Sequence, residues 1–179
     1  MNLFNRLWQW KRQGANRCVY RGVVEWWTVG PNGEKVRPQR FKNGLATVGI
    51  NAALETVFRS GTQYTSWYAG LIDSTGYSGV AASDTMASHA GWTEFTSYSG
   101  ANRPQWSPAA AAGGIIANTT NFSYTISADG SLKGLFITTV AAKSPGNTGT
   151  LWSTALVDRS VTNGSTLNGV YSFTLTPSS

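Results

Sequence analysis

The chain has 179 residues, with 14 basic and eight acidic side chains, one histidine and one cysteine. One cysteine excludes an internal disulfide, and no stretch reaches the roughly 18 apolar residues that a membrane-spanning helix needs. Charged residues make up 12% of the chain, about half of the roughly 25% usual for soluble proteins. With 20 glycines and eight tryptophans, this composition favours many short strands and tight turns, in one domain with or without an appended arm.

The basic residues are concentrated in the first third of the chain. Residues 1–60 hold ten of the 14, against three glutamates, which gives this third a net charge of +7. The remainder holds four basic and five acidic side chains. Lys35, Arg37 and Arg40 alternate with Val36 and Phe41, as on the solvent-facing side of a strand. We therefore expect this third to face an acidic or polar partner, with phosphate binding as the alternative.

Residues 1–16 are expected to form an N-terminal basic amphipathic arm. Leu3, Phe4, Leu7 and Trp8 fall on one face of a short helix. The segment lacks the continuous apolar stretch of a secretory signal. Its apolar face, about three turns long, favours packing against its own body or a neighbour over lying on a membrane. Because a helix this short is marginal alone in water, we expect the arm to order on binding.

A β-hairpin and a helix are predicted for residues 17–60. Two strand-like segments flank a turn at residues 31–33, and Pro38 places the second strand at a sheet edge because proline donates no ladder hydrogen bond. Thr47 is predicted to cap a helix that covers one side of the sheet with an apolar stripe. The stripe consists of Ile50, Leu54, Val57 and Phe58.

Residues 61–179 are predicted to form the body. Short strand candidates with turn signals about every 8–12 residues are typical of an antiparallel sandwich. Residues 74–91 form a long loop of small polar residues, and segments 115–127 and 132–141 are predicted to pair as a hairpin. The predicted fold class is therefore mainly β: an antiparallel β-sandwich or jelly roll with an N-terminal arm helix, a β-hairpin and one short packing helix.

The residues suggest no catalytic or metal-binding set. His89 stands between Asp84 and Glu94, but a zinc site needs three or four ligands, and no second histidine or cysteine is near. The favoured interpretation is that Asp84 turns the loop while His89 hydrogen-bonds within it. No phosphate-binding glycine motif, calcium loop or zinc-protease motif is present. We therefore expect no catalytic residue, metal or cofactor.

The tryptophans allow a sugar-binding platform, but core or interface positions are favoured. Adjacent residues of a strand face opposite sides. Of the pair Trp26 and Trp27, and of Trp67 and Tyr68, one member is therefore expected in the core and the other exposed or at an interface.

Three segments share a pattern with a known group of proteins. They are the strand Trp67–Ile72, the helix entry 41–49, and the loop 84–94 with the sequence DTMASHAGWTE, continued by Tyr98 and the RPQW of residues 103–106. This pattern resembles tailed-bacteriophage virion proteins. The resemblance covers about residues 41–176, is most specific in the loop and leaves the arm unmatched.

The resemblance implies a structural component of a phage particle, similar to the jelly-roll cement or decoration proteins that brace a capsid. On this interpretation the protein is not an enzyme. It binds the major capsid protein on the outside of the virion, assembles in the host cytoplasm and forms a homo-oligomer, with no membrane or nucleic-acid partner. We expect the partner contacts to come from the first third: Leu3, Phe4, Leu7, Trp8, Trp10, Arg12 and Arg17.

Three alternatives stay open. A tail or fibre component could contact the host and bind glycan through exposed tryptophans and the loop 74–91. The basic hairpin could instead bind nucleic acid, with an affinity that falls steeply with salt. An enzyme is the least favoured class, because no catalytic set is apparent.

Overall fold

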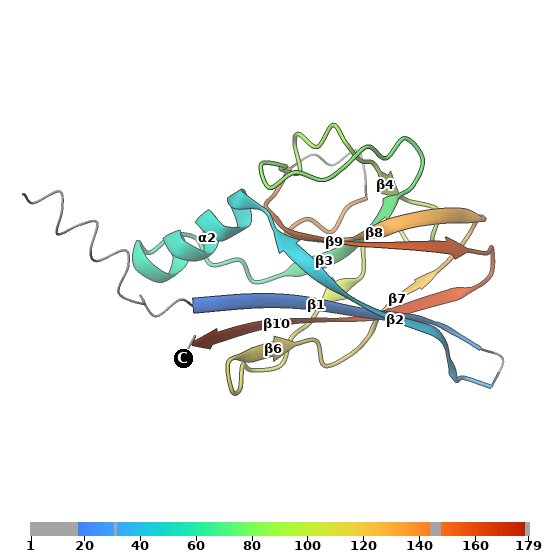
Figure 1. Cartoon of the computed structure of the whole chain (residues 1–179), viewed down its shortest axis with the longest axis horizontal. Helices are drawn as coiled ribbons and strands as arrows, with labels where there is room; N and C mark the ends of the chain where they lie inside the picture. Colours follow the sequence, from blue (N-terminus) through green and yellow to red (C-terminus); the bar gives the residue numbers. More distant parts are fainter. Residues whose placement is uncertain (1–17, 31, 144–147, 178–179) are drawn as a thin grey trace, which may run out of the picture.

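An antiparallel β-sandwich makes up most of the chain (Figure 1). The computed structural model describes residues 18–30, 32–143 and 148–177, so the predicted arm of residues 1–16 lies outside the described residues. The described residues hold ten strands and one helix. These are β1 (Cys18–Val29), β2 (Lys35–Leu45), α2 (Thr47–Phe58), β3 (Trp67–Asp73), β4 (Glu94–Phe95), β5 (Gln105–Trp106), β6 (Ile115–Ala117), β7 (Phe122–Thr125), β8 (Gly130–Thr138), β9 (Leu151–Val161) and β10 (Thr166–Pro177).

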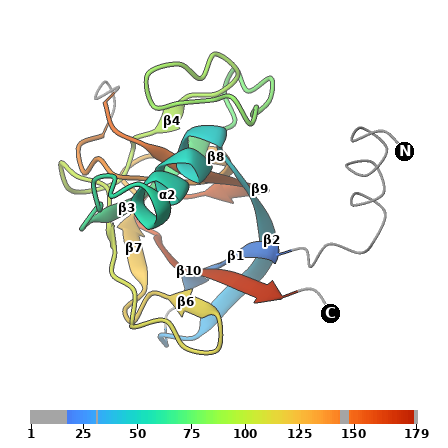
Figure 2. The ribbon, with the colours of Figure 1, turned by 90° about the vertical axis from the view of Figure 1, so that its left-hand side faces the viewer.

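The strands form two sheets that share β2. In the first sheet, β1 lies between β10 and the first part of β2, and β6 and β7 pair with β10. In the second sheet the order is β4-β3-β8-β9, and residues 43–45 of β2 continue it by pairing with β9. Strand β2 therefore joins the two sheets along one side of the sandwich (Figure 2). The prediction of a mainly β antiparallel sandwich is confirmed, whereas this strand order does not confirm a jelly roll.

An interruption in β2 accompanies its passage between the sheets. The β1–β2 register shifts between Trp26 and Thr28, and opposite this shift Arg37 has a φ of +50°. Pro38 lies here, in the part of β2 that pairs with β1 alone among the described strands, which confirms the predicted edge position. The Arg159 guanidinium from β9 donates to the carbonyl oxygen of Arg37 at 2.8 Å, so a side chain of the second sheet satisfies the freed backbone group.

Each face of the second sheet is covered by a different part of the chain. The face toward the first sheet contributes to the main core, in which Trp26 of β1, Leu71 of β3 and Tyr171 of β10 are buried. The opposite face packs Phe136 of β8 against Trp92 in a smaller cluster beneath the loop 74–91 (Figure 1). The predicted long loop therefore exists, and it forms a third layer.

The Tyr171 hydroxyl joins the two sheets inside the main core. It accepts hydrogen bonds from Asn43 Nδ2 on β2 and from Trp152 Nε1 on β9, both at 2.9 Å. The backbone N–H of Tyr171 donates to Asn118 Oδ1 at 2.7 Å, and its carbonyl oxygen accepts from Trp106 Nε1 at 3.0 Å. Because these buried polar groups satisfy one another, they fix the sheets at a defined spacing.

The predicted hairpin between segments 115–127 and 132–141 is wrong. Strands β6 and β7 pair with β10 in the first sheet, whereas β8 pairs with β3 and β9 in the second. The chain crosses between the sheets at residues 126–129. There Asp129 Oδ1 accepts from the backbone N–H of Asn163 at 2.7 Å, which ties this turn to the β9–β10 turn.

Two predictions about α2 are also wrong. Its N-cap residue is Ala46, and no side chain caps it; instead, the backbone N–H of Thr47 donates to the carbonyl oxygen of Ala82 at 2.7 Å. The apolar stripe does not cover the sheet, because Leu54, Val57 and Phe58 are 50%, 71% and 77% exposed.

The helix contacts β9 of the second sheet through small residues, while Val48 in its first turn packs against the smaller cluster. Gly49 is the buried residue of α2, and a Cβ atom there would lie 2.8 Å from both Cα and the carbonyl oxygen of Trp152 on β9. Ala52 and Ala53 follow Gly49 and are partly buried. The backbone of α2 can approach β9 this closely only because glycine lacks a side chain, and this approach turns the apolar stripe outward.

We predict that Gly49→Ala destabilises the fold by about 1–3 kcal/mol, because the added methyl group must push α2 away from the β9 backbone. This loss outweighs the roughly 1 kcal/mol that alanine gains over glycine in helix propensity. Urea denaturation followed by tryptophan fluorescence measures the change.

Gly44→Ala is the matched control, since nothing lies within 4 Å of the position that a Cβ would take. We expect Gly44→Ala to leave the free energy of unfolding nearly unchanged. Equal stability of the two variants would contradict the role assigned to the close approach.

Candidate functional site

An apolar pocket lies at the end of the sandwich where α2 sits, the end that faces the viewer in Figure 2. It has a volume of about 280 Å³. One wall is the small-residue face of α2, and the others are mostly aromatic side chains from both sheets. The residues that line it include Gly49, Ala52, Ala53, Thr56 and Val57 of α2, and Tyr64, Trp67, Trp106, Ile116, Trp152 and Phe173.

A row of aromatic rings crosses this end from the second sheet to the first. Tyr64 contacts Trp67 edge-on with ring centroids 5.6 Å apart, and Trp67 contacts Trp152 at 5.8 Å. Trp152 contacts Phe173 at 5.3 Å, and Phe173 stacks on Tyr20 at 6.4 Å. Since Trp152 is also hydrogen-bonded to the Tyr171 hydroxyl, the floor of the pocket is anchored in the core.

Most of the exposed large apolar side chains gather around this pocket. Nine are exposed in the described part of the chain. Three of the nine belong to the α2 stripe, and Tyr64 lines the pocket itself. Tyr20 stacks on the pocket-lining Phe173 and is the cross-strand neighbour of Leu175. Ile115 comes directly before Ile116, which also lines the pocket. An apolar surface of this kind is typical of a binding site for another protein segment. Its members are Tyr20, Leu54, Val57, Phe58, Tyr64, Ile115 and Leu175, and we call it the apolar end.

The predicted contact residues of the arm lie outside the described residues. Leu3, Phe4, Leu7, Trp8, Trp10, Arg12 and Arg17 all precede Cys18, the first residue of β1. Strand β1 begins at the apolar end (Figure 1), and Tyr20, two residues after Cys18, already belongs to it. Sequence reasoning missed the apolar end because it assigned the α2 stripe to the sheet.

The outer face of the β1–β2 hairpin is exposed and basic. Arg21, Lys35, Arg40 and Lys42 are all exposed on it, and the pair Glu25–Arg40 shows that the two strands share this face. Glu25 is engaged by Lys35, whose Nζ lies 2.9 Å from Oε1. The predicted alternation of solvent-facing basic residues is therefore confirmed, and we call this surface the basic face.

Both members of the Trp26–Trp27 pair are buried, so the expectation that one of them is exposed is wrong. Trp26 faces the core, while Trp27 lies on the other side of β1, with Lys35 Nζ 3.9 Å from the centre of its ring. A long basic side chain can cover an aromatic ring while its charge remains in water. The covering lysine removes this tryptophan as a sugar-stacking surface.

The loop residues Asp84 and His89 act within the loop, as predicted. Asp84 Oδ2 accepts from the backbone N–H of Ala81 and from Trp92 Nε1, both at 2.9 Å. The His89 ring stacks on Trp92 with centroids 3.9 Å apart, and its Nδ1 bonds the carbonyl oxygen of Trp92. Across residues 18–30, 32–143 and 148–177, no group of three or more His, Cys, Asp or Glu side chains could hold a metal ion. Trp92 is buried and offers no surface to a sugar.

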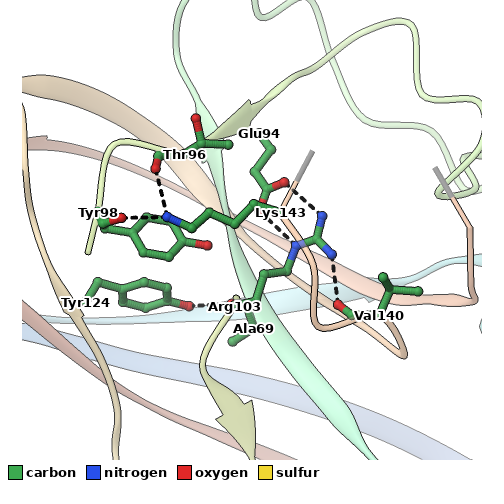
Figure 3. Close-up of polar contacts among 8 residues, drawn as sticks. All are labelled: Ala69, Glu94, Thr96, Tyr98, Arg103, Tyr124, Val140 and Lys143. Carbon is green, nitrogen blue, oxygen red and sulfur yellow. Dashed lines mark hydrogen bonds and ion pairs between the residues drawn. The ribbon is translucent and has the colours of Figure 1, made fainter. Parts of the chain in front are cut away.

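A buried ion pair is the feature that sequence reasoning missed most clearly. Arg103 donates from Nε and Nη2 to the two carboxylate oxygens of Glu94, each at 2.8 Å, and from Nη1 to the carbonyl oxygen of Val140 at 2.8 Å (Figure 3). Both side chains are almost completely buried. This bidentate geometry compensates the two charges for their loss of hydration. It ties β4 to the segment that precedes β5 and to the segment that follows β8.

Lys143 and two tyrosines surround this pair (Figure 3). Lys143 Nζ donates to the carbonyl oxygens of Thr96 and Tyr98 and lies 3.9 Å from the centre of the Tyr98 ring. Burial lowers the pKa of Lys143 and raises the pKa of Tyr98, the latter further through the nearby Glu94 charge. Burial also raises the pKa of Tyr124, whose hydroxyl donates to the carbonyl oxygen of Ala69 at 2.9 Å. The Tyr124 hydrogen bond joins β7 of the first sheet to β3 of the second.

Comparison of the sequence with protein-family models and with curated proteins found no match. No helix among the described residues is long and apolar enough to cross a bilayer. The apolar end and the basic face are therefore the surfaces from which a function can be argued.

We predict that Glu94→Gln destabilises the protein by about 3–5 kcal/mol, because it leaves the Arg103 charge buried without its partner. Thermal or urea denaturation measures the loss. Asp158→Asn is the control, since Asp158 pairs with Lys133 on the surface and should cost at most about 1 kcal/mol. Similar losses in the two variants would contradict the structural role of the buried pair.

We also predict that stability falls above about pH 10. Burial raises the pKa of Tyr171 to about 12 and raises those of Tyr98 and Tyr124. Above pH 10 the unfolded chain loses the phenolic protons that the folded protein retains, so each tyrosine removes up to about 1.4 kcal/mol per pH unit.

Urea denaturation at successive pH values measures this slope, and phenolate absorbance shows when the tyrosines ionise. Phenolate absorbance from all seven tyrosines while the protein is still folded would contradict the assignment.

Proposed function

We propose that the protein is a non-enzymatic structural component of a tailed-phage particle. In this proposal it is a cement or decoration protein that binds the major capsid protein on the outside of the head, stabilises the head and is present in many copies that contact one another. The alternative is a tail or fibre component that contacts the host surface.

The observation that carries the proposal is the segregation of charge onto one surface. Arg21, Arg40 and Lys42 lie exposed on the basic face, while residues 61–179 hold four basic and five acidic side chains in all. A rigid sandwich with one basic face suits docking on a broad acidic protein surface. Arg12 and Arg17 precede β1 in sequence and would extend this surface.

The residues that carry the resemblance to phage virion proteins support a structural role. Asp84 holds Trp92, Glu94 holds Arg103, and Trp106 bonds the backbone of Tyr171. These contacts fasten the long loop and β5 to the sandwich. A protein that braces a capsid needs this rigidity more than it needs a reactive group.

The basic face also fits a protein partner better than the phosphate backbone of a nucleic acid. Its cations are distributed over two strands and interrupted by Glu25, which Lys35 engages at 2.9 Å. Nucleic-acid binding generally requires a denser basic stripe.

We predict that the full-length protein binds purified capsids of its phage lacking this component, and that the double variant Arg40→Glu with Lys42→Glu lowers the affinity at least about tenfold, because like charges then face the acidic coat surface. Co-sedimentation with capsids, quantified by mass spectrometry, measures occupancy.

Lys133→Glu is the matched control, since it reverses a cation on β8, outside the basic face; we expect it to bind normally. No sedimentation with capsids would contradict the proposal. A few copies on tails would favour the tail or fibre alternative. A gel shift of DNA that disappears in the double variant would favour nucleic-acid binding.

A further inference from the structure

We infer that the apolar end is the docking site of the chain's own N-terminal segment, with Leu3, Phe4, Leu7 and Trp8 packed on the α2 stripe and over the pocket. This inference goes beyond the proposed function and does not depend on it. It assigns these four side chains to the protein's own body rather than to the capsid.

The apolar end is an exposed apolar surface, and we expect another protein segment to cover it. Leu54 and Phe58 lie on the face of α2 opposite Gly49, which is held against β9, and Val57 lines the pocket yet remains exposed. Tyr20 and Leu175, cross-strand neighbours on β1 and β10, continue the exposed surface on the other side of the pocket. Contiguous apolar surface of this kind is rare on monomeric proteins unless something covers it.

The shape and chemistry of the pocket fit apolar side chains of a protein segment. Its volume of about 280 Å³ is just below the roughly 300–1,000 Å³ of typical small-molecule sites. Thr56 and Gln63 are the polar side chains in its lining that carry no aromatic ring; the Thr56 hydroxyl donates to the carbonyl oxygen of Ala52, and the Tyr64 hydroxyl accepts from Thr150. The pocket therefore offers little to orient a polar ligand, whereas it can accept large apolar side chains from an amphipathic helix.

The N-terminal segment has the right length and attachment point. Seventeen residues precede β1, and Tyr20 already stacks on the pocket-lining Phe173. A helix over residues 2–13 would be about 18 Å long, the same as the 12 residues of α2. Residues 14–17 would link such a helix to β1 and can span up to about 13 Å when extended.

Attachment favours the chain's own segment over that of another copy. A tethered segment that begins beside its docking site has a high effective concentration there, in the millimolar range for a short flexible linker. In a helix whose apolar face covers α2, Arg6 and Arg12 remain off that face, while Lys11 comes at the C-terminal end of the face, where its long side chain can still reach water. The docked arm would therefore exchange an apolar surface for a basic one.

Cysteine cross-linking in the full chain tests the inference. On a Cys18→Ser background, Leu7→Cys is combined with Val57→Cys on α2, and a short bis-maleimide is added to dilute protein. We expect an intrachain link, detected by peptide mass spectrometry. In the control pair, Leu7→Cys is combined with Val29→Cys, an exposed site at the far end of β1 about 30 Å from Tyr20. This pair should give no intrachain link.

A dye-binding measurement gives an independent readout. In the full chain, Leu7→Asp with Trp8→Asp should raise the fluorescence of a hydrophobic dye severalfold, because the apolar end becomes uncovered. Arg12→Ala, off the apolar face of the arm, should not raise it. Circular dichroism confirms that both variants keep the sandwich.

Each other outcome overturns the inference. Links between chains rather than within one would assign the apolar end to the arm of a second copy. Two results would indicate that the apolar end binds a different protein. One is equal linking at the Val57 and Val29 positions, or no linking at the Val57 position; the other, expected with it, is unchanged dye fluorescence. None of these measurements involves a capsid, so their failure is distinguishable from failure of the proposed function.

Discussion

The close approach of α2 to β9 determines the surfaces of this protein. At Gly49 the two backbones come so near that a Cβ atom would lie 2.8 Å from the backbone of Trp152. The helix therefore packs through small residues, which reverses the usual rule that the apolar stripe of an amphipathic helix faces the core. The stripe turns outward, a pocket remains between α2 and the aromatic floor, and the end of the sandwich becomes a binding surface.

The interior depends on buried polar groups that satisfy one another. The Tyr171 hydroxyl joins β2, β9 and β10, and the pair of Glu94 and Arg103 holds β4 against its neighbours. Such groups lose hydration on folding, so they stabilise a fold only when their bonding is complete. Glu94 and Arg103 stand on either side of Tyr98 in the segment that follows the long loop, and Arg103 also bonds the carbonyl oxygen of Val140 after β8. The pair therefore fastens this segment to the second sheet.

Local patterns predicted much of the fold, whereas long-range packing escaped them. The β1–β2 hairpin, the final strand and the position of α2 follow from turn residues and periodicity within short windows. Strand β7 pairs with β10 and not with β8 because the chain crosses to the other sheet between β7 and β8. The ion pair of Glu94 with Arg103 likewise depends on how the chain is placed in three dimensions, and no local pattern marks it. The orientation of α2 could not be read from its stripe, because Gly49 and Ala53 suggest small contacts only once β9 is known to lie beside them.

The described part of the first third combines two properties, a net positive charge and four of the seven exposed side chains of the apolar end, to which the body contributes the other three. On β1 these properties are separated in space: Tyr20 belongs to the apolar end and Arg21, the next residue, to the basic face. Successive residues of a strand point to opposite sides, so one strand can serve both surfaces. The apolar end and the basic face therefore meet at the start of β1.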